Sequence, residues 1–361
     1  MIKKNYVIFA HRMNQQKVII SNQLDQTLEE AISECEHDST FILADKTTEK
    51  CCLPLVDGIE SLKDAKRIVI EATDTHKDLE SLSHVWQQLS EGKATRHTLL
   101  INIGGGMVTD LGGFAASTFK RGINYINIPT TLLSMVDASV GGKTGINFLG
   151  LKNEIGVFNN ASSVILDTEF LKTLDTENLL SGYAEMLKHG LISNDKMLGE
   201  LLSFDIEKPD LEQLKKMVAD SVAVKQRIVT EDPTEKGIRK ALNLGHTAGH
   251  AFESLALRRK PVLHGYAVAW GLIVELYLSA IKTGFPTEKM RQTVRFILDH
   301  YGKMNITCDD YPMLLELMTH DKKNVAGIIN FTLLGGVGDI LINQTATKDE
   351  IFEAFDFYRE S

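Results

Sequence analysis

The order of hydrophobic patterns along the chain is the feature that most limits its fold. Up to about residue 170, short apolar runs such as 68–70 and 99–103 alternate with longer stretches of helical spacing. This alternation is typical of strands connected by helices. From Thr176 onward strand signals nearly vanish, and segments such as 211–229 carry apolar residues at helical spacing. The pattern therefore predicts an α/β half followed by a mostly helical half.

The length of the chain and its few prolines define the expected domain organisation. A chain of 361 residues exceeds the usual size of one domain, and its 7 prolines argue against a long linker. We therefore expect two closely packed domains, 1–172 and 173–361. The apolar run 6–10 is expected to form the first strand. The run 266–281 is shorter than the roughly 20 residues of a membrane span, so a buried helix is expected there.

The charge balance and the cysteines limit the partners and the location that we expect. The 39 Lys and Arg against 48 Asp and Glu leave a net charge of −9, which argues against nucleic acid or a membrane surface as a partner. An anionic ligand would then need a local basic pocket. The 4 cysteines have neither metal-site nor disulfide spacing, and no export signal is recognised, so the expected location is the cytoplasm.

A glycine-rich turn at 104–110 is the first candidate ligand site. It follows a predicted strand and precedes an apolar helix, so its backbone N–H groups could face a pyrophosphate. The run departs from the dinucleotide fingerprint because Thr109 stands where the last glycine would be. A tight structural turn explains the glycines equally well.

A second glycine-rich run, 140–144, ends like a Walker loop. Asp137 occupies the position where that loop needs its first glycine, so the run is not a P-loop. Lys143 could still bind a phosphate as a point charge beside glycine amides, and a solvated lysine in a turn is equally compatible with the sequence.

The histidines of the second half form the sharpest pattern. His246 and His250 lie four residues apart and so share one face of a helix, with His264 a short connection beyond. Glu185 and Lys188 share a helix face too, where an ordinary surface ion pair is the simplest interpretation. Two histidines and one carboxylate suit a catalytic zinc, and spacing alone proposes His246 and His250 as the ligand pair. Other cations give no local signal and are most often solvated; these are Lys225, Arg239, Lys322 and Lys323.

Taken in order, these motifs resemble the 3-dehydroquinate synthases of the sugar-phosphate cyclase family. The resemblance covers about residues 74–338. The residues that carry it are Gly104–Asp110, Arg121–Gly122, Pro129–Leu133, Val136–Thr144, Lys152–Asn153, Glu185 with Lys188, Asn243–His250 and Asp321–Lys323. It implies an α/β, Rossmann-like nucleotide-binding domain followed by a mostly α-helical metal- and substrate-binding domain.

The resemblance also implies a role for individual residues. One divalent metal, zinc or cobalt, is held by Glu185, His246 and His264, whereas His250 is kept for acid–base work. The catalytic residues are Glu235, His250, Lys188 and Asn243. NAD lies along Asp45, Asp74, Lys77, Gly105, Gly106, Asp110, Thr130, Thr131, Lys152, Phe170 and Thr173. The substrate is held by Arg121 from a neighbouring subunit and by Asp137, Lys143, Asn153, Lys225, Arg239, Lys322 and Lys323. This sequence has Asp74 where the family usually has Glu.

The implied reaction converts the small sugar phosphate 3-deoxy-D-arabino-heptulosonate 7-phosphate to 3-dehydroquinate and phosphate. It proceeds by NAD-mediated transient oxidation, phosphate elimination, reduction, ring opening and intramolecular aldol closure, in a homodimer. The alternatives are another sugar-phosphate cyclase, or a metal- and NAD-dependent polyol dehydrogenase of the glycerol-dehydrogenase type. A catalytically silent nucleotide-binding regulator is disfavoured because Glu185, His246, His250 and His264 are all present.

Overall fold

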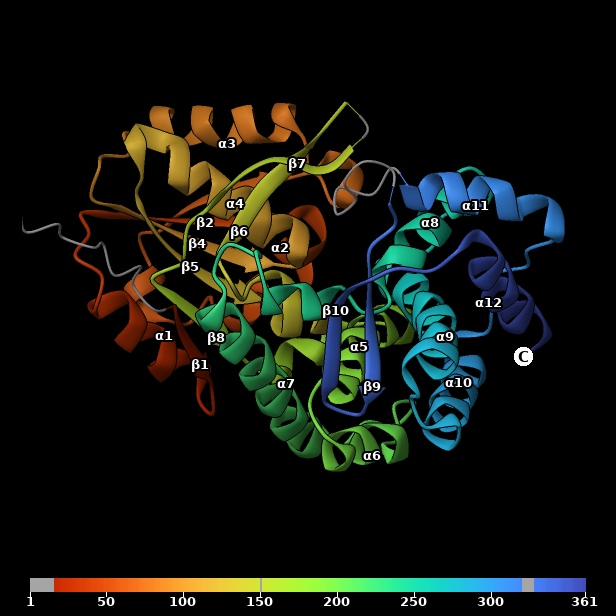
Figure 1. Cartoon of the computed structure of the whole chain (residues 1–361). Coiled ribbons are helices and arrows are strands. Elements are labelled where there is room, and N and C mark those ends of the chain that lie inside the picture. Colours follow the sequence, from red (N-terminus) through yellow and green to blue (C-terminus); the bar gives the residue numbers. More distant parts are fainter. Residues whose placement is uncertain (1–15, 150, 320–327) are drawn as a thin grey trace, which may run out of the picture.

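The computed structural model describes residues 16–149, 151–319 and 328–361. The first part of the chain forms an α/β layer structure, and the later part packs beside it as a group of helices (Figure 1). The strand expected at 6–10 and the predicted substrate residues Lys322 and Lys323 lie outside the described residues.

A six-stranded sheet organises the first half, in the order β1-β8-β5-β4-β2-β3, and every strand pair in it is parallel. All residues of β4 are buried, as expected for a parallel strand covered on both faces. The predicted apolar runs 68–70 and 99–103 lie in β3 and β4. The strands are β1 (Lys17–Ile20), β2 (Ser39–Asp45), β3 (Lys66–Ile70), β4 (Thr98–Gly104), β5 (Asn124–Pro129) and β8 (Ser163–Leu166).

The connections from β1 to β5 each contain a helix, which confirms the predicted α/β half. The helices are α1 (Leu24–Ser33), α2 (Lys46–Cys51), α3 (Leu79–Glu91) and α4 (Gly106–Thr118). The chain runs from β2 outward to β3 and then returns to β4 on the other side of β2. The strand order therefore reverses between β2 and β4, and open parallel sheets bind their ligands at the carboxyl ends of strands at such a point.

Between β5 and β8 the chain forms a hairpin of β6 (Lys143–Phe148) and β7 (Leu151–Phe158). Strand β6 packs on α4, whereas every residue of β7 is exposed. Within the described chain, β7 pairs with β6 alone, so its outer edge carries unpaired backbone groups.

The second half is mostly helical, as predicted. Its helices are α5 (Thr176–Leu191), α6 (Asp195–Ser203), α7 (Leu211–Glu231), α8 (His246–Leu257), α9 (His264–Thr283), α10 (Thr287–Tyr301), α11 (Tyr311–Thr319) and α12 (Lys348–Glu360). It also contains an antiparallel hairpin of β9 (Phe331–Gly336) and β10 (Asp339–Gln344), which the sequence pattern missed. The first four residues of β9 are all buried, Thr332 included, so the strand lacks the alternation of a half-exposed strand. The domain boundary near residue 172 stays a prediction.

Helix α9 is central to the helical half. It is long and apolar enough to cross a membrane by length and composition, yet 72% of its most apolar window is buried inside the protein. It packs against α5, α8, α10 and α12. The expectation of a buried helix at 266–281 is thus confirmed, and the cytoplasmic location stays a prediction.

Candidate active site

The carboxyl ends of the parallel strands gather most of the residues predicted to bind NAD. Asp45 is the last residue of β2, and Gly105 follows β4 directly. Strands β2 and β4 are hydrogen-bonded neighbours, so Asp45 and Gly105 flank the point where the strand order reverses. Asp74 and Lys77 follow β3, Thr130 and Thr131 follow β5, and Phe170 and Thr173 follow β8. One edge of the sheet therefore brings together residues that are up to 128 positions apart, from Asp45 to Thr173.

The glycine-rich turn is the strand–turn–helix that the sequence predicts. Gly105 caps the amino terminus of α4, which begins at Gly106. A Cβ on Gly105 would lie 3.2 Å from Thr131 Cγ2, so the two turns approach closely there. The hydroxyl of Thr109 donates to the Gly106 carbonyl at 3.2 Å and stays within its own helix. The first N–H groups of α4 therefore lie at this edge of the sheet, and the start of a helix favours an anionic ligand.

A buried lysine joins two predicted binding regions. Lys77 is 3% exposed and donates from Nζ to Asp110 on α4 and to Asn153 on β7. Burial raises the pKa of Asp110, although Lys77 opposes this shift. The three side chains belong to segments far apart in the sequence, so the fold places the predicted cofactor and substrate residues in direct contact.

Lys152 on β7 continues this chain of contacts toward the histidines. Its Nζ donates to Glu253 Oε1 at 2.8 Å and lies 3.6 Å from Asp74 Oδ2. The other oxygen of Glu253 lies 3.4 Å from His264 Nδ1. Burial opposes ionisation of Glu253, yet His264 and Lys152 lower the pKa of this carboxyl. The same contact raises the pKa of His264 against the effect of burial.

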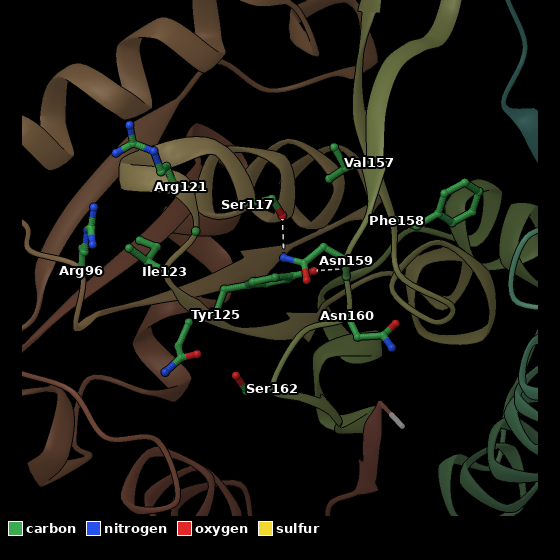
Figure 2. A pocket seen from close by; sticks show the side chains of 12 residues that line it. Arg96, Ser117, Arg121, Ile123, Tyr125, Val157, Phe158, Asn159, Asn160 and Ser162 are labelled. Atoms are coloured by element: carbon green, nitrogen blue, oxygen red, sulfur yellow. Dashed lines mark hydrogen bonds between the residues drawn. The ribbon is translucent and has the colours of Figure 1, made fainter. Parts of the chain in front are cut away.

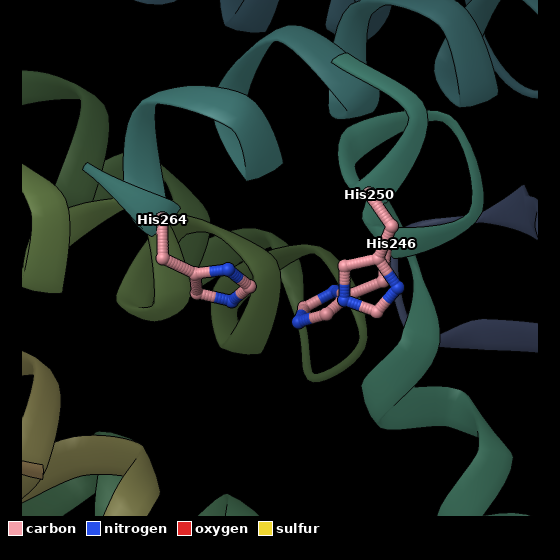
Figure 3. A group of neighbouring side chains, drawn as sticks. All are labelled: His246, His250 and His264. Carbon is pink, nitrogen blue, oxygen red and sulfur yellow. The ribbon is translucent and has the colours of Figure 1, made fainter. Parts of the chain in front are cut away.

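The three histidines of the second half point toward one another (Figure 3). His246 and His250 project from α8 and His264 from the first turn of α9, and a ring nitrogen from each lies within 4.8 Å of the others. The two helices approach very closely, because a Cβ on Gly271 would lie 2.0 Å from the Gly245 carbonyl oxygen. Gly271 therefore permits the helix contact that assembles this cluster.

Glu185 completes the cluster from α5. Its Oε1 lies 3.3 Å from His246 Nε2 and 3.7 Å from His264 Nε2, yet it makes no hydrogen bond within the described residues. A buried carboxylate oxygen without a hydrogen bond, facing two imidazole nitrogens, fits a divalent metal such as zinc. His250 shares the same space, so the structure assembles four candidate ligands: Glu185, His246, His250 and His264.

The ion pair of Glu185 with Lys188 is buried, and its interpretation as a surface pair is wrong. The side chains are 0% and 1% exposed, and Lys188 Nζ donates to Glu185 Oε2. Burial disfavours the charged carboxylate, but Lys188 and then His246 hold its pKa well below the usual value. An amine this close to the histidine cluster can hold or release a proton there.

A second buried ion pair lies under the turn 137–143. Lys225 on α7 is 6% exposed and donates from Nζ to Asp137 Oδ1 at 2.5 Å. Burial opposes ionisation of Asp137, while Lys225 lowers the pKa of this carboxyl. Lys225 is therefore buried. Its local sequence alone favoured a solvated side chain, and that interpretation is wrong.

Glu235 links the remaining predicted catalytic and substrate residues. It accepts hydrogen bonds from Lys143 Nζ and, at 3.0 Å, from Asn243 Nδ2. Arg239 is 3% exposed and donates to the Gly141 carbonyl at 3.2 Å, so it too is buried rather than solvated. Three cations thus lie at the turn 137–143: Lys143 belongs to it, and Lys225 and Arg239 donate to Asp137 and Gly141 within it. A group of cations at one turn is what an acidic protein would need for an anionic ligand.

Comparison with known protein families shows to which family this chain belongs. The family model for the 3-dehydroquinate synthase N-terminal domain matches residues 67–181, and the model for the C-terminal domain matches residues 182–324. The chain belongs to the 3-dehydroquinate synthase family.

Relatives support this membership along nearly the whole chain. The 3-dehydroquinate synthase of Parabacteroides distasonis is 55% identical over 350 residues, which cover 97% of this chain and 99% of the relative. The 3-dehydroquinate synthase of Pyrococcus furiosus is 38% identical over 89% of this chain and 93% of the relative. Among solved structures, the 2-epi-5-epi-valiolone synthase of Streptomyces hygroscopicus, with NAD+ and Zn2+ bound, has a TM-score of 0.84 at 24% identity and covers 96% of this chain and 97% of its own. That likeness supports the shared fold.

Arg121 stands apart from the other residues that the 3-dehydroquinate synthase resemblance singled out. It lines a separate cavity of about 460 Å³, together with Arg96, Tyr125 and Phe158 (Figure 2). No hydrogen bond or ion pair connects it to the histidine cluster within the described residues.

Two buried side chains next to the cluster escaped the sequence analysis. Glu253 follows His250 by three positions and so shares its helix face, a spacing that could have indicated it. His189 follows Lys188 directly and is fully buried. It follows Glu185 by four positions on α5, a spacing that could have indicated it, whereas its hydrogen-bond partner Ser221 comes from α7.

Proposed function

We propose that this member of the 3-dehydroquinate synthase family converts 3-deoxy-D-arabino-heptulosonate 7-phosphate to 3-dehydroquinate and phosphate. The observation that carries the proposal is the position of three histidines, two of them half-buried, and the buried Glu185 next to two buried lysines and a basic turn, beside the carboxyl ends of a parallel sheet. The family membership and the 55% identity to a 3-dehydroquinate synthase support the same reaction.

The proposed NAD site follows the carboxyl ends of the strands. The turn at Gly105 and Gly106 and the start of α4 would receive the pyrophosphate. Its other proposed contacts are Asp45, Asp74, Lys77, Asp110, Thr130, Thr131, Lys152, Phe170 and Thr173. Lys77 holds Asp110 in place, and Lys152 connects the nucleotide edge with the histidine cluster through Glu253.

The proposed metal ligands are Glu185, His246 and His264. When bound, a divalent metal such as zinc or cobalt supplies a Lewis acid for a substrate hydroxyl, and NAD supplies a reversible hydride acceptor. Glu253 orients the His264 ring by its contact with Nδ1 and leaves Nε2 directed at Glu185. Lys188 fixes the second oxygen of Glu185, so the carboxylate keeps one oxygen toward the histidines.

The proposed substrate contacts are the basic turn and its partners. Lys143, Lys225 and Arg239 would hold the phosphate, because their charges converge on one turn of an otherwise acidic protein. Asp137 would accept hydrogen bonds from substrate hydroxyls, and the Asn153 amide would accept or donate them. Lys322 and Lys323 belong to the same proposed set. The phosphate would thus be anchored before it leaves, and burial of Lys225 and Arg239 strengthens that attraction.

The proposed acid–base residues lie within reach of this site. His250 shares the space of the metal ligands and can move a proton at a ring nitrogen, while Lys188 Nζ can hold one beside Glu185. Glu235 is kept ionised, because Lys143 lowers its pKa against the effect of burial, and it can accept a proton at Oε1 or Oε2. Asn243 orients Glu235 through its hydrogen bond to Oε1.

Catalytic use of NAD distinguishes this function from a polyol dehydrogenase. We expect phosphate release from the heptulosonate phosphate without sustained NADH absorbance at 340 nm, because the hydride that is removed is returned within one turnover. Phosphate is measured with a coupled colorimetric assay in the metal-loaded protein. A stoichiometric rise of NADH, or no phosphate release with metal and NAD present, would reject the proposal.

We also propose a homodimer, for which the exposed face of the β6–β7 hairpin is the support. Leu151, Ile155, Val157 and Phe158 on β7 are 38–57% exposed, on a strand whose outer edge is unpaired within the described chain. If two copies of β7 pair antiparallel, the 157–158 end of one strand meets the 151–153 end of the other. Arg121 lines the cavity beside Val157 and Phe158, so it would face the neighbouring site at its Asn153.

A mixing experiment tests this role of Arg121. We expect Arg121→Ala and His250→Ala proteins to be nearly inactive alone. After they exchange subunits, the purified mixed dimer should recover about half of wild-type activity, because one of its two sites is intact. Mixed dimers are purified with two affinity tags and assayed for phosphate release. No recovery in the purified mixed dimer would show that Arg121 does not act across the interface.

A further inference from the structure

His189 is a fully buried histidine to which the proposed reaction gives no role. It lies on α5, one helical turn after Glu185. Its Nδ1 lies 2.7 Å from the hydroxyl of Ser221 on α7, while its Nε2 has no hydrogen-bond partner within the described residues. A buried polar nitrogen without a partner is destabilising, so its position calls for a partner in the working protein.

The neighbours of His189 are the charged groups of the site. A ring nitrogen of His189, an oxygen of Asp137 and an oxygen of Glu185 lie within 4.8 Å of one another. These three groups could be read as a second cation site. Lys188 and Lys225 already donate to the two carboxylates, however, and two ammonium groups at this distance repel a further cation. The ring is therefore better explained as a hydrogen-bonding group.

The contact with Ser221 identifies which ring nitrogen carries the proton. In a neutral imidazole one ring nitrogen donates a hydrogen bond and the other accepts one. The Ser221 hydroxyl has no acceptor other than His189 Nδ1 in the described part of the chain. If the hydroxyl donates to Nδ1, the proton of the ring is at Nε2. Nε2 is then a donor, and Glu185 Oε1 is a buried acceptor without a hydrogen bond.

We propose that His189 is a positioning residue that donates from Nε2 to the Glu185 carboxylate and holds it in the orientation that the metal requires. Residues four apart on a helix are neighbours, so a small side-chain rotation brings the two groups together. Carboxylates that bind metals are commonly held by such an outer hydrogen bond. The inference rests on the proposed metal site, and it concerns metal affinity rather than the identity of the substrate.

Two substitutions separate this role from simple packing. In His189→Gln the side-chain amide can replace Nε2, whereas in His189→Asn it can replace only Nδ1 and its contact with Ser221. We expect Asn to weaken Zn2+ binding by about 10- to 100-fold and Gln by less than about 3-fold. Zn2+ affinity is measured by competition with a chromogenic chelator on the full chain, and thermal unfolding of the metal-free proteins controls for folding.

The outcomes of the Zn2+-binding experiment can be told apart from those of the phosphate-release assay. Equal weakening by Gln and Asn, or wild-type Zn2+ affinity in His189→Asn, would overturn the proposal even if phosphate release is confirmed. If neither His189 variant folds, Ser221→Ala tests the proposal, because it removes the hydroxyl that holds the ring at Nδ1 and so loosens the direction of Nε2. We expect that variant to bind Zn2+ more weakly by several-fold, and an unchanged affinity would count against the proposal.

Discussion

Replacing His264 with alanine is expected to remove the metal and the activity together. His264 Nε2 faces Glu185 Oε1 at 3.7 Å, and its ring is one of three imidazoles in the cluster. A site that loses one of three ligands should bind Zn2+ at least about 100-fold more weakly, since loss of an outer partner alone costs 10- to 100-fold. Because Lewis-acid stabilisation is worth several kcal/mol, turnover should fall by about 10³-fold or more.

The measurement is metal content after gel filtration together with the rate of phosphate release. His84→Ala, an exposed histidine on α3, is the matched control and should keep both. The His264→Ala protein should remain folded in the metal-free state, which near- and far-UV circular dichroism can check. An active His264→Ala protein that retains its metal would refute the ligand assignment.

Replacing Lys188 with methionine is expected to destabilise the protein strongly at neutral pH. Lys188 and Glu185 are 1% and 0% exposed, so the substitution leaves a buried carboxylate without its ammonium partner. Breaking a buried ion pair on one side typically costs about 3–5 kcal/mol. We expect the free energy of unfolding of the metal-free protein, measured in urea, to fall by that amount, and phosphate release to be lost.

The double variant Lys188→Met/Glu185→Gln is the control, because it removes both charges and should recover most of the lost stability.

The stabilisation by this ion pair should change with pH in a definite direction. In the wild type, Lys188 lowers the pKa of Glu185 against burial, so the stabilisation is present above the unfolded carboxyl pKa of about 4.3 and is lost as the pH falls through the folded value. In Lys188→Met, burial raises the pKa instead, and the stability difference should shrink from pH 7 toward pH 4. A difference that stays constant over this range would contradict the ion-pair argument.

The sequence predicts those parts of the site that depend on local spacing. The strand–turn–helix at 104–110 follows from apolar runs around three glycines, and the pairing of His246 with His250 follows from the helical period. The α/β half and the helical half follow from the same periodicity. These features need no knowledge of which helix packs on which.

Features that depend on packing between distant segments are outside the reach of sequence spacing. Lys225 and Arg239 look like solvated cations until α7 and the turn after it pack against the glycine turn at 141–142. The Glu185–Lys188 pair looks exposed until α7 and α9 pack on α5. His189 becomes notable only beside Ser221 of α7. The β9–β10 hairpin was missed because the first four residues of β9 are all buried and so lack the alternation of a half-exposed strand.

The role of NAD as a catalyst is the central claim, and a titration with limiting NAD tests it most directly. NAD-free, metal-loaded protein is mixed with excess 3-deoxy-D-arabino-heptulosonate 7-phosphate and increasing amounts of NAD below the enzyme concentration. Phosphate and 3-dehydroquinate are counted at completion. The account predicts equal amounts of both products, many per NAD added, with no NADH left over. Product formation that stops at one phosphate per NAD, with an equal amount of NADH, would contradict it.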